Sequence, residues 1–278
     1  MTVREPALPV DPRLPGEPTV LEVGGTRLWL ARRGVLVWLP TRLLALRIGG
    51  RRLRGVGTPT YSIVLAVLWV SIGALFTVVE LPGRVAVLAV MFAVSQILRW
   101  RGVQSREQLV EGLAGTEAPP PLRVAAKQVG WWYLTSTALT FVGGAVLCAA
   151  SFLTAPQFTW KHWYSPSVAL GTHTFALAVG AGATALVVGR VLRAPVIAED
   201  GTSRLVDGIL RAEDPYRFAP SGVYAVLAMP GYVVDWATPG LLGWAALAYL
   251  VTVVVLQLIG WLLVCYRYRR LPPGFYGR

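Results

Sequence analysis

The sequence is poor in charge, and acidic residues are especially few. Charged residues make up 14% of the 278 residues, whereas hydrophobic residues make up 55%. An average soluble domain carries about 25% charged residues. This composition excludes an ordinary soluble fold and predicts an integral membrane protein.

Cysteines and catalytic motifs are also scarce. Cys148 and Cys265 lie inside apolar runs, where a thiol packs as a small hydrophobe, and two cysteines cannot form a disulfide framework. The chain has no G-x-S-x-G, H-E-x-x-H or GxxxxGK[ST] motif, no aspartate cluster for metals and no aromatic-basic module for nucleic acid. We therefore expect no enzyme, no cofactor, no metal site and no nucleic-acid partner.

Six apolar segments are candidates for membrane-spanning helices. A hydrocarbon core of about 30 Å requires about 20 mainly apolar helical residues. Pro230 and Gly231 interrupt the fifth segment and Asp235 lies near its end, so a kinked span and a re-entrant segment are both compatible with it. The predicted spans are residues 61–80, 84–100, 131–155, 167–189, 222–238 and 241–266.

Lysine and arginine indicate the orientation of these spans. With six spans and a cytoplasmic N-terminus, only Arg84 and Lys161 lie on the outer side. A re-entrant fifth segment would move the basic residues 267–270 outside and remove this asymmetry. We therefore predict an all-α protein of the cell membrane, with about six helices in three hairpins and both termini cytoplasmic. Its net charge of +12 predicts contact with anionic lipids of the inner leaflet.

The chain contains a short polar repeat, LVEGLAGTEAP from Leu109 and LVDGILRAEDP from Leu205. Its spacing predicts amphipathic helices over about 105–115 and 202–214, with Pro215 ending the second. Their carboxylates, Glu107 and Asp214 included, are expected to project into the cytoplasm, either as a solvated face or as a surface that docks a cytoplasmic protein. The docking candidates are Leu109, Glu111, Leu113, Glu117, Leu205, Asp207, Ile209 and Glu213.

The N-terminal region, before the first span, differs from the rest. Residues 1–18 are rich in proline and are predicted to be disordered, without the apolar core of a cleavable signal peptide. In the basic region 19–60, alternation around Gly24-Gly25 predicts a small β-hairpin, followed by an amphipathic element at the inner leaflet. Trp29 and Trp38 are expected to anchor this element at the interface. Residues 267–278 form a basic cytoplasmic tail.

Ionisable residues within predicted spans are candidates for an ion or substrate path. Glu80 and Asp235 lie near outer span ends, and His173 lies inside the fourth span beside threonines. With Pro230 they make up this candidate path, although interface positions and a packed histidine explain the same residues. Small residues spaced by four in the third and fourth spans predict that these two helices pack closely.

Two functions fit these patterns. The first is a non-enzymatic membrane subunit of a transport or envelope complex, which docks a cytoplasmic partner through the repeated helices. The second is a self-contained small transporter or channel that uses the broken fifth segment. The repeat favours the first, and the scarcity of polar residues at mid-membrane depth disfavours the second.

Overall fold

The computed structural model describes residues 16–51, 84–114, 116–154, 166–228, 240–272 and 275. These residues are mainly helical, and two short strands, β1 (Thr116–Glu117) and β2 (Val196–Ile197), pair antiparallel. The predicted first span with Glu80 lies outside the described residues, as do Pro230, Asp235 and residues 1–15 of the predicted N-terminal tail.

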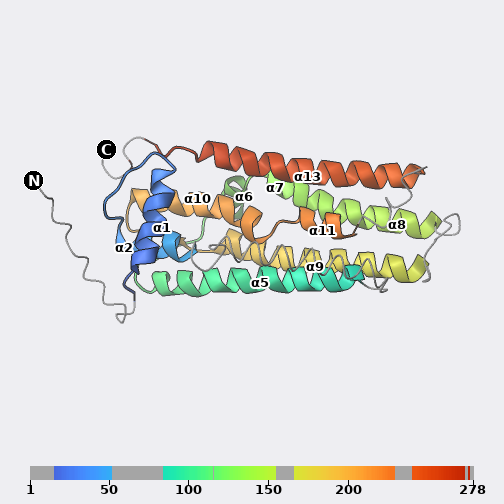
Figure 1. Ribbon diagram of the computed structural model, residues 1–278, viewed down its shortest axis with the longest axis horizontal. Helices are drawn as coiled ribbons and strands as arrows, with labels where there is room; N and C mark the ends of the chain where they lie inside the picture. The colour runs from blue at the N-terminus through green and yellow to red at the C-terminus, as the bar shows by residue number, and fades with distance from the viewer. Residues whose placement is uncertain are drawn as a thin grey trace, which may run out of the picture.

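Four long helical segments run side by side along the longest axis of the molecule (Figure 1). Each is long and apolar enough to cross a membrane, and they confirm the predicted second, third, fourth and last spans. The architecture is that of an all-α membrane protein. The segments are α5 (Arg84–Glu111), the continuous α7 (Trp131–Ala138), η2 (Leu139–Gly143) and α8 (Gly144–Thr154), α9 (Pro166–Arg193) and α13 (Leu241–Arg267).

Helix α9 packs against α5 and α8 of these segments and also against α11 (Gly222–Ala228). Helices α5 and α9 run in the same direction: Ala89 and Ala176 share one apolar cluster, and further along Arg190 donates to Gln104 at 2.6 Å. The contact of α8 with α9 agrees with the close packing predicted from their small residues. Gly144 on α8 contributes to it, because the side chain of Leu177 on α9 occupies the place of its missing Cβ, whereas Gly180 on α9 packs against the ring of Tyr224 on α11.

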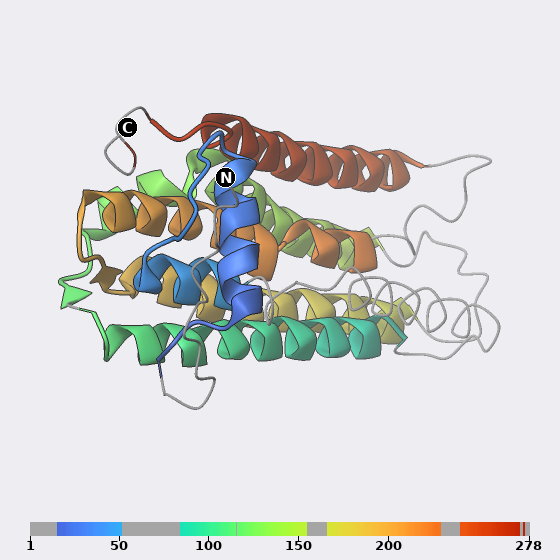
Figure 2. The same cartoon turned by 60° about the vertical axis from the view of Figure 1, so that its left-hand side comes forward.

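The remaining helices form a layer at the end of the bundle where α5, α9 and α13 finish (Figures 1 and 2). We call it the inner layer. The bounds of its helices are α1 (Val20–Ala31), α2 (Arg42–Leu44), η1 (Ala45–Gly49), α6 (Leu122–Val129) and α10 (Gly201–Phe218). Helix α6 corresponds to no element predicted from the sequence.

The predicted N-terminal β-hairpin is wrong, because residues 20–31 form helix α1. Thr19 and Glu22 close a capping box at its first turn, which satisfies backbone N–H groups that a helix end leaves unpaired. The buried face of α1 packs on η1 so closely that the backbone of Glu22 lies where Gly49 would carry a Cβ. Trp29 is only 4% exposed within this packing, so it is not an interfacial anchor. Tertiary contacts therefore outweigh the low helix propensity of the two glycines in the middle of α1.

The two predicted repeat helices are also corrected. The first copy of the repeat does not form a separate helix at 105–115, because α5 continues from the bundle as far as Glu111. The second copy lies in α10, which extends to Phe218 with Pro215 inside its last turn. Tyr216 and Phe218, which follow this proline, are buried in the apolar cluster beneath the inner layer. Their burial keeps the chain helical beyond the proline.

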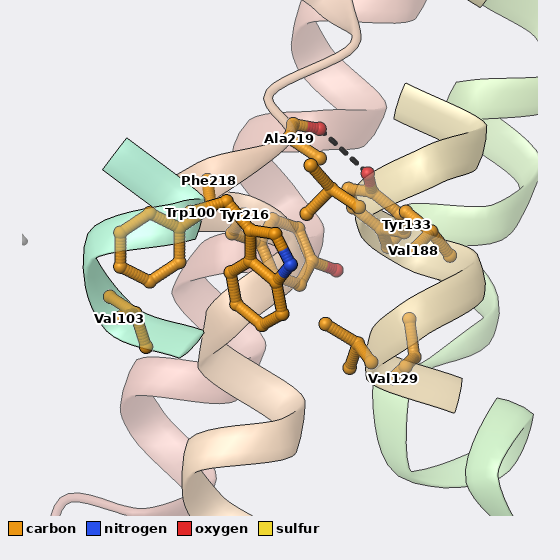
Figure 3. Packing of buried hydrophobic residues seen from close by; sticks show 10 residues of the cluster. Trp100, Val103, Val129, Tyr133, Val188, Tyr216, Phe218 and Ala219 are labelled. Atoms are coloured by element: carbon orange, nitrogen blue, oxygen red, sulfur yellow. Dashed lines mark hydrogen bonds between the residues drawn. The ribbon is translucent and has the colours of Figure 1, made fainter. Parts of the chain in front are cut away.

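That cluster joins the inner layer to the bundle, and Figure 3 shows its side chains converging. The hydroxyl of Tyr133 on α7 donates to the backbone oxygen of Ala219, just after α10, at 2.6 Å. Tyr133 and Tyr216 pack edge to face, with ring centroids 5.0 Å apart. The other members are Trp100, Val103, Val129, Val187, Val188, Val191 and Phe218.

The packing of α9 on α11 yields a stability prediction. Gly180→Ala places a methyl group against the ring of Tyr224, so overpacking should lower the free energy of unfolding by about 1–3 kcal/mol. Gly182→Ala is the matched control, because its Cβ would meet open space on the same helix. Unfolding of the purified, detergent-solubilised variants provides the comparison. Equal stability of the two variants would contradict the close approach of α9 and α11.

Candidate functional site

The inner layer is built around a set of buried ion pairs, which we call the ionic network: Arg47, Arg51, Glu107, Asp207, Arg211 and Asp214. The side chain of Arg47 is 3% exposed and lies at its centre. Its Nη2 lies 2.9 Å from Glu107 Oε2 and 2.7 Å from Asp207 Oδ1, and its Nη1 donates to the carbonyl oxygen of Ile197 at 2.9 Å. One guanidinium thus joins η1, α5, α10 and β2.

Helical spacing brings the other members of the ionic network into place. Arg51 lies one turn beyond Arg47 and pairs with both Glu107, at 2.9 Å, and Asp214. On α10, Arg211 lies one turn beyond Asp207 and pairs with it at 3.0 Å. Arg211 also donates to three backbone carbonyls at and just beyond the end of α9, those of Val191, Ala194 and Pro195. A cation here satisfies carbonyls that the helix end leaves unpaired.

Two further pairs fasten the N-terminal segment to the same structure. Arg33 pairs with Glu213 of α10, and Arg106 of α5 pairs with Glu22 of α1. The guanidinium of Arg33 also lies 3.7 Å from the ring centroid of Trp29. In the second copy of the repeat, Asp207, Glu213 and Asp214 are therefore counter-ions for arginines that come earlier in the chain.

The pKa shifts show that these arginines stay charged. Burial opposes the charge on Arg51, but Asp214 and Glu107 outweigh it and raise the pKa of Arg51 above its ordinary value. The pKa of Arg47 is raised in the same way, because Glu107 and Asp207 outweigh burial. Burial raises the pKa of Asp214, and Arg51 opposes this shift. Arginines held in the charged form serve as fixed counter-ions and not as proton carriers.

The prediction that the carboxylates face solvent is therefore wrong for Glu107, Asp207, Glu213 and Asp214. Their side chains are largely or fully buried in ion pairs. Glu117 is exposed and pairs with Arg204. The physical reason is that the basic N-terminal region packs over the repeat and supplies its counter-ions.

The predicted docking residues are dispersed by the fold. Ile209 is 1% exposed and Leu205 packs beside it, in a cluster that includes Trp29 and Leu30 of α1. The chain itself thus covers the apolar face of the second copy. In the first copy, Leu109 and Glu111 are half-buried and Leu113 is 45% exposed.

Of the candidate ion or substrate path, the structure describes one member, His173, which is buried in α9. Glu80, Pro230 and Asp235 lie outside the described residues.

Sequence reasoning missed the roles of Arg33, Arg47, Arg51 and Arg211, which counted only towards the orientation of the spans. The four-residue spacing of Arg47 with Arg51, and of Asp207 with Arg211, was a usable signal, because residues four apart share one helix face.

A cavity of about 510 Å³ lies between the ionic network and the ends of α5 and α9. Residues of the network form one side of it, and Trp100, Ala185 and Leu186 form an apolar side. The remaining polar lining comes from Gln104, Gln108, Glu111, Arg190 and Arg193.

A second hollow, of about 540 Å³, lies at the surface of the inner layer, beside α1. We call it the α1 groove. It is formed by the exposed face of α1 and the segment after it, in which Leu36 is 70% and Trp38 is 59% exposed. The guanidinium of Arg27 lies 5.0 Å from the ring centroid of Trp38. The lining residues are Gly24, Arg27, Leu28, Ala31, Leu36, Val37 and Trp38.

Among the residues that the structure describes, no group of three or more His, Cys, Asp or Glu side chains is arranged to hold a metal ion. No protein-family model, curated protein or solved structure matches this chain.

The ionic network yields a second stability prediction. Arg47→Met leaves the carboxylates of Glu107 and Asp207 buried without their central partner, which should lower the free energy of unfolding by about 3–5 kcal/mol. Arg204→Met is the control, because it removes an exposed pair with Glu117 and should cost about 0–1 kcal/mol. Denaturant unfolding of the purified variants measures both. Similar costs for the two variants would show that the network does not support the inner layer.

Proposed function

We propose that this membrane protein is a non-enzymatic subunit of a transport or envelope complex in the cell membrane, and that its inner layer docks a cytoplasmic protein. The observation that carries this proposal is the α1 groove, an exposed apolar hollow on helix α1, which lies outside the spanning helices. Exposed apolar surface on the spans is covered by lipid, whereas the same surface elsewhere indicates a binding site.

The orientation of the proposal follows from charge. The inner layer contains the arginines of α1, η1 and α10 together with those at the ends of α5, α9 and α13. Because cytoplasmic segments are enriched in such residues, the inner layer is assigned to the cytoplasmic side.

Six crossings are part of the proposal, and the positions of the helix ends support them. Arg51 lies in the inner layer, whereas α5 begins at the opposite end of the bundle (Figure 1). Likewise α9 ends beside the inner layer, and α13 begins at the opposite end. The connections between these helices therefore each join opposite ends of the bundle, as a first and a fifth span would.

The position of α1 separates the α1 groove from the hydrocarbon. On α5, the apolar run ends at Arg99, and Arg106 pairs with Glu22 of α1. Seven residues at about 1.5 Å each place this contact about 10 Å beyond Arg99, past the hydrocarbon boundary. A protein segment is thus a better occupant for the α1 groove than an acyl chain.

The lining defines the chemistry of the partner. Exposed residues recur along α1 at Leu21, Gly24, Leu28 and Ala31, a spacing that suits a second helix packed against it. Gly24 has open space where a Cβ would stand, so a partner backbone can approach closely. Arg27 on the same face complements a carboxylate. The proposed partner segment is therefore an amphipathic helix with an acidic residue beside its apolar face.

The alternative is a transporter that uses the fifth segment. At the described start of that segment, polar groups are paired within the protein. Tyr224 donates to Gln96 at 2.8 Å, and the hydroxyls of Ser221 and Thr137 lie 3.0 Å apart. Such pairs between spans are typical of helix packing and do not favour a substrate path.

Docking is tested by filling the α1 groove. A photo-crosslinker at Leu36 captures the partner in cells, and binding of the identified, purified partner is then measured. Gly24→Trp should weaken binding about tenfold or more, because the indole takes the partner's place, whereas Gly24→Ala should leave binding unchanged. Arg27→Glu should also weaken it. A partner that binds Gly24→Trp and wild type equally contradicts the proposal, and so does capture of lipid alone.

Orientation is tested separately by labelling. In a background with Cys148→Ala and Cys265→Ala, Glu199→Cys introduces a single thiol at an exposed position of the inner layer. A membrane-impermeant maleimide should leave this thiol unlabelled in intact cells and label it once the membrane is permeabilised. Labelling in intact cells would reverse the assignment.

A further inference from the structure

Charged side chains that do not belong to the ionic network also line the cavity beside it. Three arginines and three carboxylates of the cavity wall pair with one another, so the network is neutral as a whole. Arg190, Arg193 and Glu111 also line the cavity, and none of them forms an ion pair within the described residues. Arg190 bonds the neutral side chain of Gln104 instead.

These three charges are separated along the bundle axis. Gln104 of α5 and Arg190 of α9 lie at the same level, since they form a hydrogen bond and the two helices run in the same direction. At about 1.5 Å per residue, Arg193 lies about 4 Å beyond that level and Glu111 about 10 Å beyond it. The cavity thus offers two cationic groups near the membrane and one anionic group further from it.

The apolar side of the cavity lies nearest the hydrocarbon. Ala185 and Leu186 precede Arg190 within the candidate span of α9, and Leu186 is 40% exposed. The indole of Trp100 forms the α5 side at this level. The lining changes from apolar to charged as it leaves the membrane, which matches an amphiphile held with its headgroup towards the inner layer.

We infer that this cavity binds a phospholipid whose headgroup carries both a phosphate and a primary ammonium. Arg190 and Arg193 bind the phosphate, because guanidinium groups match the geometry of phosphate oxygens. The carboxylate of Glu111 accepts hydrogen bonds from the ammonium group. An acyl chain runs along Ala185 and Leu186. This site is independent of the docking proposal, since the α1 groove shares no lining residue with it.

The test measures the lipid that stays bound to the full-length protein in native mass spectrometry. The purified protein is equilibrated with mixed micelles of equimolar phosphatidylethanolamine, phosphatidylglycerol and phosphatidylcholine. One phosphatidylethanolamine should be retained in preference to the other two. Soluble phosphoethanolamine, in a separate arm, should compete poorly because it lacks the acyl chain.

Matched variants test which residues bind the phosphate and which bind the ammonium group. Arg190→Gln with Arg193→Gln should weaken phosphatidylethanolamine binding about tenfold or more, and Glu111→Gln about tenfold, which is the loss expected for a charge-assisted hydrogen bond. Arg123→Gln with Lys127→Gln on α6, and Glu199→Gln, remove equal charge from exposed positions outside the cavity and should have no effect.

Each other outcome overturns the inference. Equal retention of phosphatidylglycerol, with no effect of Glu111→Gln, excludes recognition of the ammonium group. Equal losses in the cavity variants and the control variants would show attraction by net charge alone. Competition by soluble phosphoethanolamine as strong as that of the lipid would identify a soluble ligand. Because all six substituted residues are at least partly exposed and lie outside the ionic network, folding is expected to be retained.

Discussion

The inner layer depends on the burial of one guanidinium, that of Arg47. A charge removed from water is costly unless close counter-ions and hydrogen bonds replace the solvent. Arg47 receives these from Glu107 on α5, Asp207 on α10 and the backbone of Ile197. The partners come from segments 60 and 160 residues away along the chain. The N-terminal region is therefore an integral part of the fold, and η1 supplies a counter-ion for the buried acidic side of α10.

The same pairing explains how α10 joins the inner layer to the long helices of the bundle. Its acidic and basic residues are buried along most of its length, which an unpaired helix of this composition would not tolerate. With those charges neutralised, the next turn of α10 brings Tyr216 and Phe218 into the cluster over α5, α7 and α9 (Figure 3). The bond from Tyr133 to Ala219 fixes the junction. The α1 groove and the cavity are thus formed on a packed base, which favours preorganised binding surfaces.

Sequence alone predicts the parts of this fold that depend on local composition. The spans at α8, α9 and α13 can be predicted because each contains an apolar run long enough to cross a membrane, whatever the rest of the chain does. The sequence of α1 favours a hairpin because Gly24 and Gly25 signal a turn, although Thr19 and Glu22 form a helix-start pattern. The repeat shows what local sequence cannot predict. Glu111 and Asp207 occupy equivalent positions, yet Glu111 is half-exposed and Asp207 is buried against Arg47. Which carboxylate is buried depends on arginines distant in sequence.

The ionic network also bears on whether the two surfaces can influence each other. Arg47 and Asp214 line the cavity, while the α1 groove lies on the far face of α1, whose buried face packs on η1. Coupling between two sites requires an element with two arrangements that each ligand favours differently. In the ionic network every arginine is paired with a carboxylate, and a rearrangement that separated Arg51 from Asp214 would leave the buried carboxylate of Asp214 without its arginine. Such a network resists rearrangement, so the free energies of binding at the α1 groove and at the cavity are expected to add independently.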